Sequence, residues 1–228
     1  MRTPSNPTDP HAGQPVITQG PKPTDARLTI ILVHGRGASA DDIIGLAQEL
    51  RFDDVAYLAP QAAGNTWYPY SFLAPMAQNE PGISSAIHVV SRLVESLGGQ
   101  GVDPQRIAFL GFSQGACLTL EFAARHAGRY AGVFALSGGL IGPPGTPRNY
   151  AGSFGGTPVF LGCSDVDPHI PLERVHESAD VFGRMDANVD ERIYPRMGHS
   201  VNQDEIHAIQ EILRVAPGST GTVAQVGQ

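Results

Sequence analysis

The chain has 228 residues, a length that corresponds to one large domain. Its formal net charge of −7 argues against nucleic acid or an anionic membrane surface as the main partner. Lys22 is the only lysine and lies in a proline-rich leader, which argues against a Schiff-base lysine or a phosphate-loop lysine.

Along the chain, residues 1–26 are rich in Pro, Thr, Gln and Gly and predict a flexible N-terminal arm. Residues 27–216 then alternate apolar runs with segments of helical period, and residues 217–228 predict a disordered tail. The expected strands are 28–33, 55–58, 106–110, 130–136, 158–161 and 190–194, and the expected helices are 41–50, 83–97, 114–126, 171–185 and 202–215. This alternation predicts one three-layer α/β domain, with a mainly parallel sheet covered by helices on both faces.

Both cysteines, Cys117 and Cys163, lie in apolar segments, which predicts that they are buried and reduced. Residues 1–20 contain prolines and no apolar core segment, so we expect no secretory signal there. No apolar run approaches the roughly 18 residues that a membrane span requires. By elimination, the expected location is the cytoplasm.

The strongest local signal is the segment Gly111-Phe112-Ser113-Gln114-Gly115, which matches the G-x-S-x-G turn between a strand and a helix. An apolar strand is expected directly before it and a helix directly after it. Such a turn lifts a serine hydroxyl above the sheet edge, where it can act as a nucleophile. The alternative is a glycine-rich turn with a solvent-exposed serine.

A serine nucleophile requires a base, and in α/β hydrolases the histidine follows the serine and the acid along the chain. His126, His176 and His207 fall within expected helices. His199 instead follows the last expected strand in a loop, and loops at the carboxyl ends of parallel strands carry the sites of such folds. His199 is therefore the candidate base.

The orienting acid is expected in the loop after strand 158–161, which contains both Asp165 and Asp167. Spacing alone does not choose between these two carboxylates, and both being structural turn residues is a further alternative. The oxyanion hole requires two backbone N–H groups. The Gln114 amide is one by the geometry of the turn, and the loop His34-Gly35-Arg36-Gly37 is expected to supply the other. A phosphate-binding turn competes for this loop, but the G-x-G-x-x-G spacing and a lysine are missing.

Taken together, several segments resemble the phospholipase/carboxylesterase family: LVHGRG, LAP near residue 60, GFSQGA, LSGGL, GCSDVDPHIP and MGHS. The similarity extends in order from about Leu28 to Val215. It implies an α/β-hydrolase fold without a large lid domain, a reaction that needs no cofactor or metal, and relatives that often form homodimers. The family includes acyl-protein thioesterases, lysophospholipases and small bacterial carboxylesterases.

Carried over by motif, the resemblance implies that Ser113 is the nucleophile, His199 the base and Asp167 the acid, with Asp165 as second choice. It also implies that the oxyanion amides are those of Arg36 and Gln114. Two departures stand out. Arg36 occupies a position where many relatives carry leucine, and residues 65–72 are more aromatic than the thioesterase pattern. From this loop we expect the substrate pocket to be lined by Trp67, Tyr68 and Phe72. The alternative is that these aromatic residues belong to the core.

Three other functions compete with this interpretation. A dienelactone-type hydrolase needs a cysteine nucleophile, but Cys117 lies four positions beyond the turn serine. A metal hydrolase built from His169, His176, His199 and His207 would lack the H-E-x-x-H spacing. A binding protein on an inactive hydrolase scaffold has no need for the complete set of groups.

The expected function is therefore a serine hydrolase that cleaves small-molecule carboxylic esters of short to medium acyl or aryl groups through an acyl-enzyme. The alternative is a lysophospholipase or an acyl thioesterase that acts on longer chains.

Overall fold

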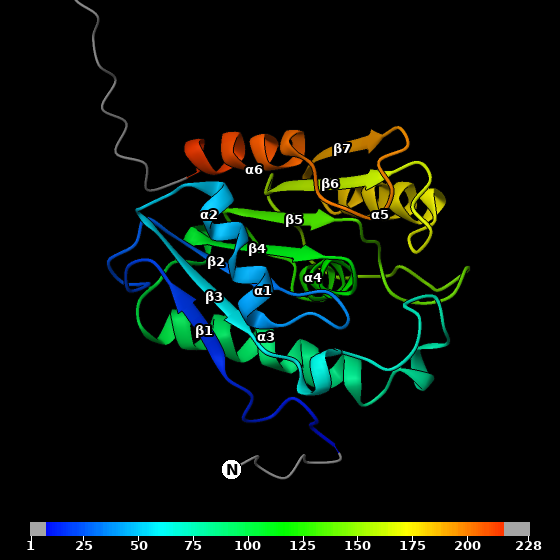
Figure 1. Ribbon diagram of the computed structural model, residues 1–228, viewed down its shortest axis with the longest axis horizontal. Helices are drawn as coiled ribbons and strands as arrows, with labels where there is room; N and C mark the ends of the chain where they lie inside the picture. Colours follow the sequence, from blue (N-terminus) through cyan, green and yellow to red (C-terminus); the bar gives the residue numbers. More distant parts are fainter. Residues whose placement is uncertain (1–7, 217–228) are drawn as a thin grey trace, which may run out of the picture.

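The computed structural model describes residues 8–216 as a seven-stranded sheet with helices on both faces (Figure 1). The strands are β1 (Val16–Gln19), β2 (Leu28–Val33), β3 (Val55–Pro60), β4 (Ile107–Phe112), β5 (Gly132–Leu136), β6 (Pro158–Ser164) and β7 (Asn188–Tyr194). The helices are α1 (Ala40–Ile44), α2 (Leu46–Leu50), α3 (Gly82–Gly99), α4 (Gln114–Arg125), α5 (Leu172–Arg184) and α6 (Gln203–Val215). This confirms the predicted three-layer α/β architecture.

The strand order across the sheet is β1-β3-β2-β4-β5-β6-β7. All neighbouring pairs are parallel except β1 and β3, which are antiparallel. After the edge strand β1, the chain enters the sheet at β2 and moves out to β3, then returns to β4 and continues to β7. Because the carboxyl ends of the parallel strands share one edge, the loops after β2, β3, β4, β6 and β7 all open on the same side of the domain.

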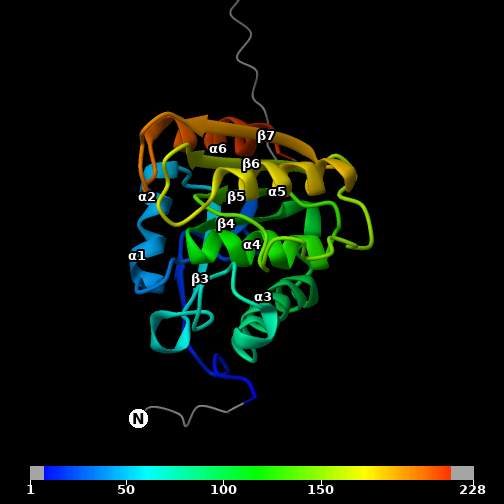
Figure 2. The ribbon, with the colours of Figure 1, turned by 90° about the vertical axis from the view of Figure 1, so that its right-hand side faces the viewer.

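The central strands are apolar because both of their faces are covered. β2 and β3 are buried along their whole length. Side chains that alternate along β2 enter two different cores. Ile31 and Val33 pack with α3, α4 and α5 on one face, whereas Leu28, Ile30 and Leu32 pack with α1, α2 and α6 on the other. Figure 2 shows these two helix layers on opposite sides of the sheet.

The N-terminal boundaries of two helices follow from side-chain caps. Ser39 begins α1 with a reciprocal pair of hydrogen bonds to Asp42, and Asn202 begins α6 with the same arrangement to Glu205. The predicted helix 41–50 is divided at Gly45, so that α1 and α2 are short, consecutive helices.

The prediction of a flexible arm through residue 26 is wrong for the part that the structure describes. Val16–Gln19 forms the edge strand β1, and the side chain of His11 is only 3% exposed. Val16, Ile17 and Thr18 are β-branched and favour an extended backbone, but four residues give too short a pattern to identify. Pairing with β3 stabilises the strand. The predicted arm residues 1–7 and the predicted tail 217–228 lie outside the described residues.

Both cysteines are free and buried, as the sequence predicted. Across residues 8–216, none of the helices has the length and apolar character needed to cross a membrane.

Candidate functional site

Ser113 lies in the sharp turn between β4 and α4. Its backbone has φ of 56° and ψ of −120°, a strained conformation for a residue with a side chain. The Ser113 amide donates to the Leu136 carbonyl of β5 at 2.9 Å, and its carbonyl accepts from the Cys117 amide at 3.0 Å. These contacts hold the turn between the sheet and the first turn of α4, which presents the hydroxyl at the strand edge.

The two glycines of the turn are required by close backbone contacts. A Cβ on Gly111 would lie 2.3 Å from the Gly115 carbonyl oxygen. A Cβ on Gly115 would lie 2.0 Å from the carbonyl oxygen of Val33 in β2. Since real Cβ atoms essentially never approach within 3.0 Å, only glycine allows α4 to begin this close to the sheet.

The structure brings together Ser113, His199 and Asp167, which follow three different strands. His199 Nε2 lies 2.8 Å from Ser113 Oγ, and His199 Nδ1 lies 2.7 Å from Asp167 Oδ2. An ionised carboxylate accepts hydrogen bonds only, so Nδ1 carries the proton and Nε2 is free to accept from the serine hydroxyl. This arrangement has the geometry of a nucleophile, a base and an orienting acid.

The Asp167 carboxylate is held in its charged form. Its side chain is fully buried, and burial alone would raise its pKa. Hydrogen bonds from His199 and from the amides of His169 and Ile170 outweigh burial and lower the pKa of Asp167 below its ordinary value. Asp167 is thus suited to remain negative beside an imidazole that gains a proton.

Asp165, the second candidate acid, has a different set of contacts. Its Oδ1 accepts from the Arg196 amide at 2.7 Å, and its own amide donates to the Tyr194 carbonyl at 3.3 Å. These bonds connect the loop after β6 to the loop that carries His199. Asp165 therefore connects the two loops by hydrogen bonds. The carboxylate that contacts the His199 imidazole is that of Asp167.

Two backbone amides next to Ser113 are free to donate. Within residues 8–216, neither the Arg36 amide nor the Gln114 amide has a hydrogen-bond acceptor. The Gln114 amide is free because it belongs to the first residue of α4, where no intrahelical acceptor exists. Both residues line the pocket beside Ser113, so the pair can bind a developing negative charge on oxygen.

His34 holds the loop that carries Arg36. His34 Nδ1 lies 2.8 Å from the Gly35 carbonyl, and His34 Nε2 accepts from the Ala62 amide at 3.1 Å. Burial lowers the pKa of His34, and these two contacts fit a neutral ring with its proton on Nδ1. The sequence analysis did not predict this role of His34, although the sequence shows His34 directly before Gly35.

The side chain of Gln114 connects the turn to the aromatic loop. Its Oε1 accepts from the Trp67 amide at 2.9 Å, and its Nε2 donates to the Tyr68 carbonyl at 2.9 Å. Oε1 also accepts from the hydroxyl of Thr66 at 3.2 Å. The sequence predicted only the backbone amide of Gln114 at the site, because nothing local indicates a contact across more than 40 residues.

The pocket beside Ser113 has a volume of about 430 Å³, within the usual range of small-molecule sites. Tyr68 and Phe72 line it, as predicted, whereas Trp67 does not. The Trp67 side chain is fully buried, and its indole N–H donates to the His34 carbonyl at 2.9 Å. The remaining lining residues are Gly35, Arg36, Ala38, Ser71, Phe112, Ser113, Gln114, Cys117, His169, Ile170 and His199.

His169 and Ile170 are pocket residues that the sequence analysis did not select. The ring of His169 lies edge-on to that of His199, with 4.8 Å between centroids. Both residues directly follow the Asp167-Pro168 turn. This position next to the acid is the sequence feature that could have identified them as site residues. Their amides hold Asp167 while their side chains form part of the pocket wall.

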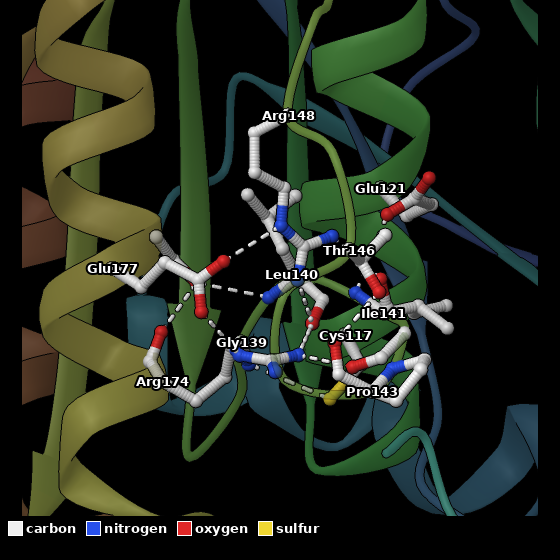
Figure 3. Close-up of polar contacts among 12 residues, drawn as sticks. Cys117, Glu121, Gly139, Leu140, Ile141, Pro143, Thr146, Arg148, Arg174 and Glu177 are labelled. Carbon is white, nitrogen blue, oxygen red and sulfur yellow. Dashed lines mark hydrogen bonds and ion pairs between the residues drawn. The ribbon is translucent and has the colours of Figure 1, made fainter. Parts of the chain in front are cut away.

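A network of charged side chains between α5 and the loop after β5 is shown in Figure 3, and its Arg174 lies over the ring of the pocket residue Phe72. The Glu177 carboxylate lies 2.8 Å from both Arg148 Nε and Arg174 Nε. Arg174 also donates to the carbonyls of Leu140 and Gly142, at 2.7 and 2.6 Å. The Gly142 amide in turn donates to the Phe72 carbonyl at 2.7 Å, so the network reaches the aromatic loop.

No three His, Cys, Asp or Glu side chains within residues 8–216 form a group that could hold a metal ion. In this part of the chain, His169, His176, His199 and His207 therefore do not form a metal site. His176 instead pairs with Glu191 at 2.6 Å, and His199 belongs to the chain with Asp167 and Ser113.

Comparison with known proteins shows the family to which the chain belongs. The family model described as Phospholipase/Carboxylesterase matches residues 12–216. A phospholipase/carboxylesterase structure from Dyadobacter fermentans is 44% identical, with a TM-score of 0.85 over 88% of this chain and 97% of that chain. Acyl-protein thioesterase 1 of Kluyveromyces lactis is 27% identical over 86% of this chain and 94% of its own length. A Bacillus cereus carboxylesterase, 20% identical with a TM-score of 0.69, covers 88% of this chain and 93% of its own and shares the fold.

The family match covers nearly the whole described chain, including β1, which the sequence prediction had assigned to a flexible arm. It includes the turn serine, the loop after β2 and the loops after β6 and β7. The protein belongs to the phospholipase/carboxylesterase family and is a hydrolase of the esterase or thioesterase type.

Proposed function

We propose that this protein is a serine carboxylesterase in which Ser113, His199 and Asp167 form the catalytic triad. The observation that carries the proposal is the continuous hydrogen-bonded chain from Ser113 Oγ through the His199 ring to Asp167, beside a pocket with two free amides. No cofactor or metal takes part in this reaction.

In the proposed mechanism, Ser113 Oγ attacks the acyl carbon of the ester and His199 Nε2 takes the hydroxyl proton. The carbonyl oxygen becomes negative and accepts hydrogen bonds from the Arg36 and Gln114 amides. Asp167 stabilises the imidazolium. His199 then gives its proton to the leaving alcohol oxygen, which breaks the ester bond and leaves an acyl group on Ser113.

The second half of the reaction repeats these steps with water. His199 removes a proton from a water molecule that attacks the acyl-enzyme, and then returns the proton to Ser113 Oγ as the acid departs. The same groups serve both halves, because one imidazole alternates between base and acid.

We further propose that the preferred substrates carry short to medium acyl or aryl groups. The buried side chains of Cys117 and Phe72 line the pocket, and the guanidinium of Arg174, which is ion-paired with Glu177, lies 5.9 Å from the centroid of the Phe72 ring. The thioesterase name of the Kluyveromyces lactis relative makes an acyl thioester the alternative substrate.

The test is a rate series on p-nitrophenyl esters from acetyl to palmitoyl, with Ser113→Ala in parallel. We expect turnover that is highest for short and medium chains and falls about 10⁴-fold or more in the Ser113→Ala variant. Highest rates on palmitoyl esters, or on matched acyl thioesters, would support the alternative substrate class. Ester turnover that does not depend on Ser113 would refute the mechanism.

A fluorophosphonate probe provides a second, independent readout. We expect it to label Ser113, and we expect labelling to be lost when His199 is replaced by alanine. Unchanged labelling in His199→Ala would exclude this histidine as the base. A complete absence of labelling in the wild type would favour a binding protein on a hydrolase scaffold.

A further inference from the structure

Arg36 places a positive charge at the pocket, and within residues 8–216 no carboxylate forms an ion pair with it. It lines the pocket and is exposed to solvent. Among residues 8–216, its guanidinium has no Asp or Glu within ion-pair distance. The other arginine close to this region, Arg174, is buried and ion-paired with Glu177. Among the residues that the structure describes, the pocket lining contains no Asp or Glu, although the chain as a whole has a net charge of −7.

The contacts of the Arg36 guanidinium use three of its N–H donors. Nη1 donates to the Thr66 hydroxyl at 3.0 Å and to the Pro69 carbonyl at 2.8 Å, and Nη2 donates to the Tyr70 carbonyl at 2.6 Å. One planar face lies over the Tyr68 ring, 5.9 Å from its centroid. Guanidinium carries five N–H donors, so these contacts leave the Nε–H and one Nη2–H without an acceptor in the described part of the chain.

Nε and Nη2 lie on the same edge of the guanidinium plane. Two parallel N–H donors on such an edge match the two oxygens of a carboxylate. The contacts with residues 66–70 hold the group in one orientation, so little side-chain freedom remains to be lost when an anion binds. A neutral ester would leave this charged edge without a partner.

The strand order indicates which part of the substrate meets Arg36. Arg36 follows β2 and its partners in residues 66–70 follow β3, and both strands lie on one side of β4. His199 follows β7, on the other side of β4. Because His199 must protonate the leaving group, the alcohol lies toward β7 and the acyl group lies toward β2 and β3.

We propose that the preferred substrates carry a carboxylate on the acyl part, so that the enzyme cleaves half-esters of dicarboxylic acids, with Arg36 as the specificity-determining residue. This inference rests on the proposed esterase function and adds the charge and the position of the acyl substituent.

The experiment compares two pairs of esters that differ only in charge. The acyl pair is mono-4-nitrophenyl adipate and its methyl ester. The leaving-group pair is 4-acetoxybenzoate and its methyl ester. For the acyl pair, we expect kcat/KM to be about tenfold higher for the anionic member at low salt, and we expect the preference to shrink at high ionic strength. We expect no such preference for the leaving-group pair.

Two Arg36 variants separate charge from the positioning of residues 66–70. Arg36→Lys keeps the charge and should keep most of the preference for the anionic acyl ester. Arg36→Gln keeps hydrogen-bonding capacity and removes the charge, so the preference should disappear. Equal losses on both members of the acyl pair in both variants would mean that Arg36 only holds the loop, and would overturn the proposal.

Two other outcomes would also overturn it. One is a wild-type preference that appears in the leaving-group pair instead of the acyl pair, and the other is no charge preference at all. Failure of the esterase function itself would be seen separately, as the absence of Ser113-dependent turnover on all four esters.

Discussion

Replacing Gly115 with alanine sets two physical effects against each other. Gly115 is in the first turn of α4, and in an exposed helix interior this exchange stabilises by roughly 0.5–1 kcal/mol, because alanine loses less backbone entropy. The structure predicts the opposite sign. The added Cβ would lie 2.0 Å from the Val33 carbonyl oxygen and 2.5 Å from that of His34.

The size of the effect follows from what the methyl group contacts. Both contacts are with backbone atoms, and β2 cannot move easily because it is paired with β3 on one side and β4 on the other. Overpacking in a core costs about 1–3 kcal/mol even where side chains can rearrange. We therefore expect Gly115→Ala to lower the free energy of unfolding by about 3 kcal/mol or more, which corresponds to a fall in Tm of roughly 6–12 °C.

Gly183 provides the matched control. It is an exposed residue of α5, and a Cβ built on it contacts nothing within 4 Å. Gly183→Ala should raise Tm by roughly 1–4 °C. The assay is thermal unfolding followed by circular dichroism, with urea unfolding as a check and ester hydrolysis measured on the same samples. A Gly115→Ala protein with wild-type Tm and activity would refute the steric argument.

Three further predictions concern single side chains. Asp167→Asn should lower kcat about 10⁴-fold. Asp165→Asn should keep most of the activity, because the side-chain amide oxygen of the new asparagine can still accept from the Arg196 amide. Comparable losses of kcat in both variants would contradict the assignment of Asp167 as the acid. Gln114→Ala leaves buried polar groups of the aromatic loop unpaired and should lower the free energy of unfolding by about 1–3 kcal/mol in urea titrations; a change within error would mean that the loop is held by other contacts. Burial raises the pKa of Glu205 from 4.5 to about 7, so folding takes up a proton and stability should fall as pH rises from 4.5 through about 7. Glu205→Gln should reduce this fall in pH-dependent urea midpoints, whereas the exposed Glu211→Gln should not, and identical profiles for both variants would contradict the burial argument.

The fold was largely predictable because its signals are local. The central strands are continuous apolar runs, as strands covered on both faces must be, and the amphipathic helices carry their period in the sequence. The edge strand β1 was missed because its local sequence pattern is weak. It has only four residues, is mostly exposed, and is extended because it pairs with β3, about 40 positions away.

The sequence by itself determined the turn around Ser113. Its two glycines are needed because neighbouring backbone segments leave no space for a Cβ atom at these positions. It also placed His199 and the two aspartates in loops at the same sheet edge, which follows from the alternation of strands and helices. Only the tertiary structure decided which carboxylate contacts His199, since that depends on a distance between residues 32 positions apart. The burial of Trp67 between two histidines, the Gln114 contacts and the Arg36 contacts were decided in the same way. Each depends on side chains from separate strands meeting in space, and local sequence patterns contain no information on those distances.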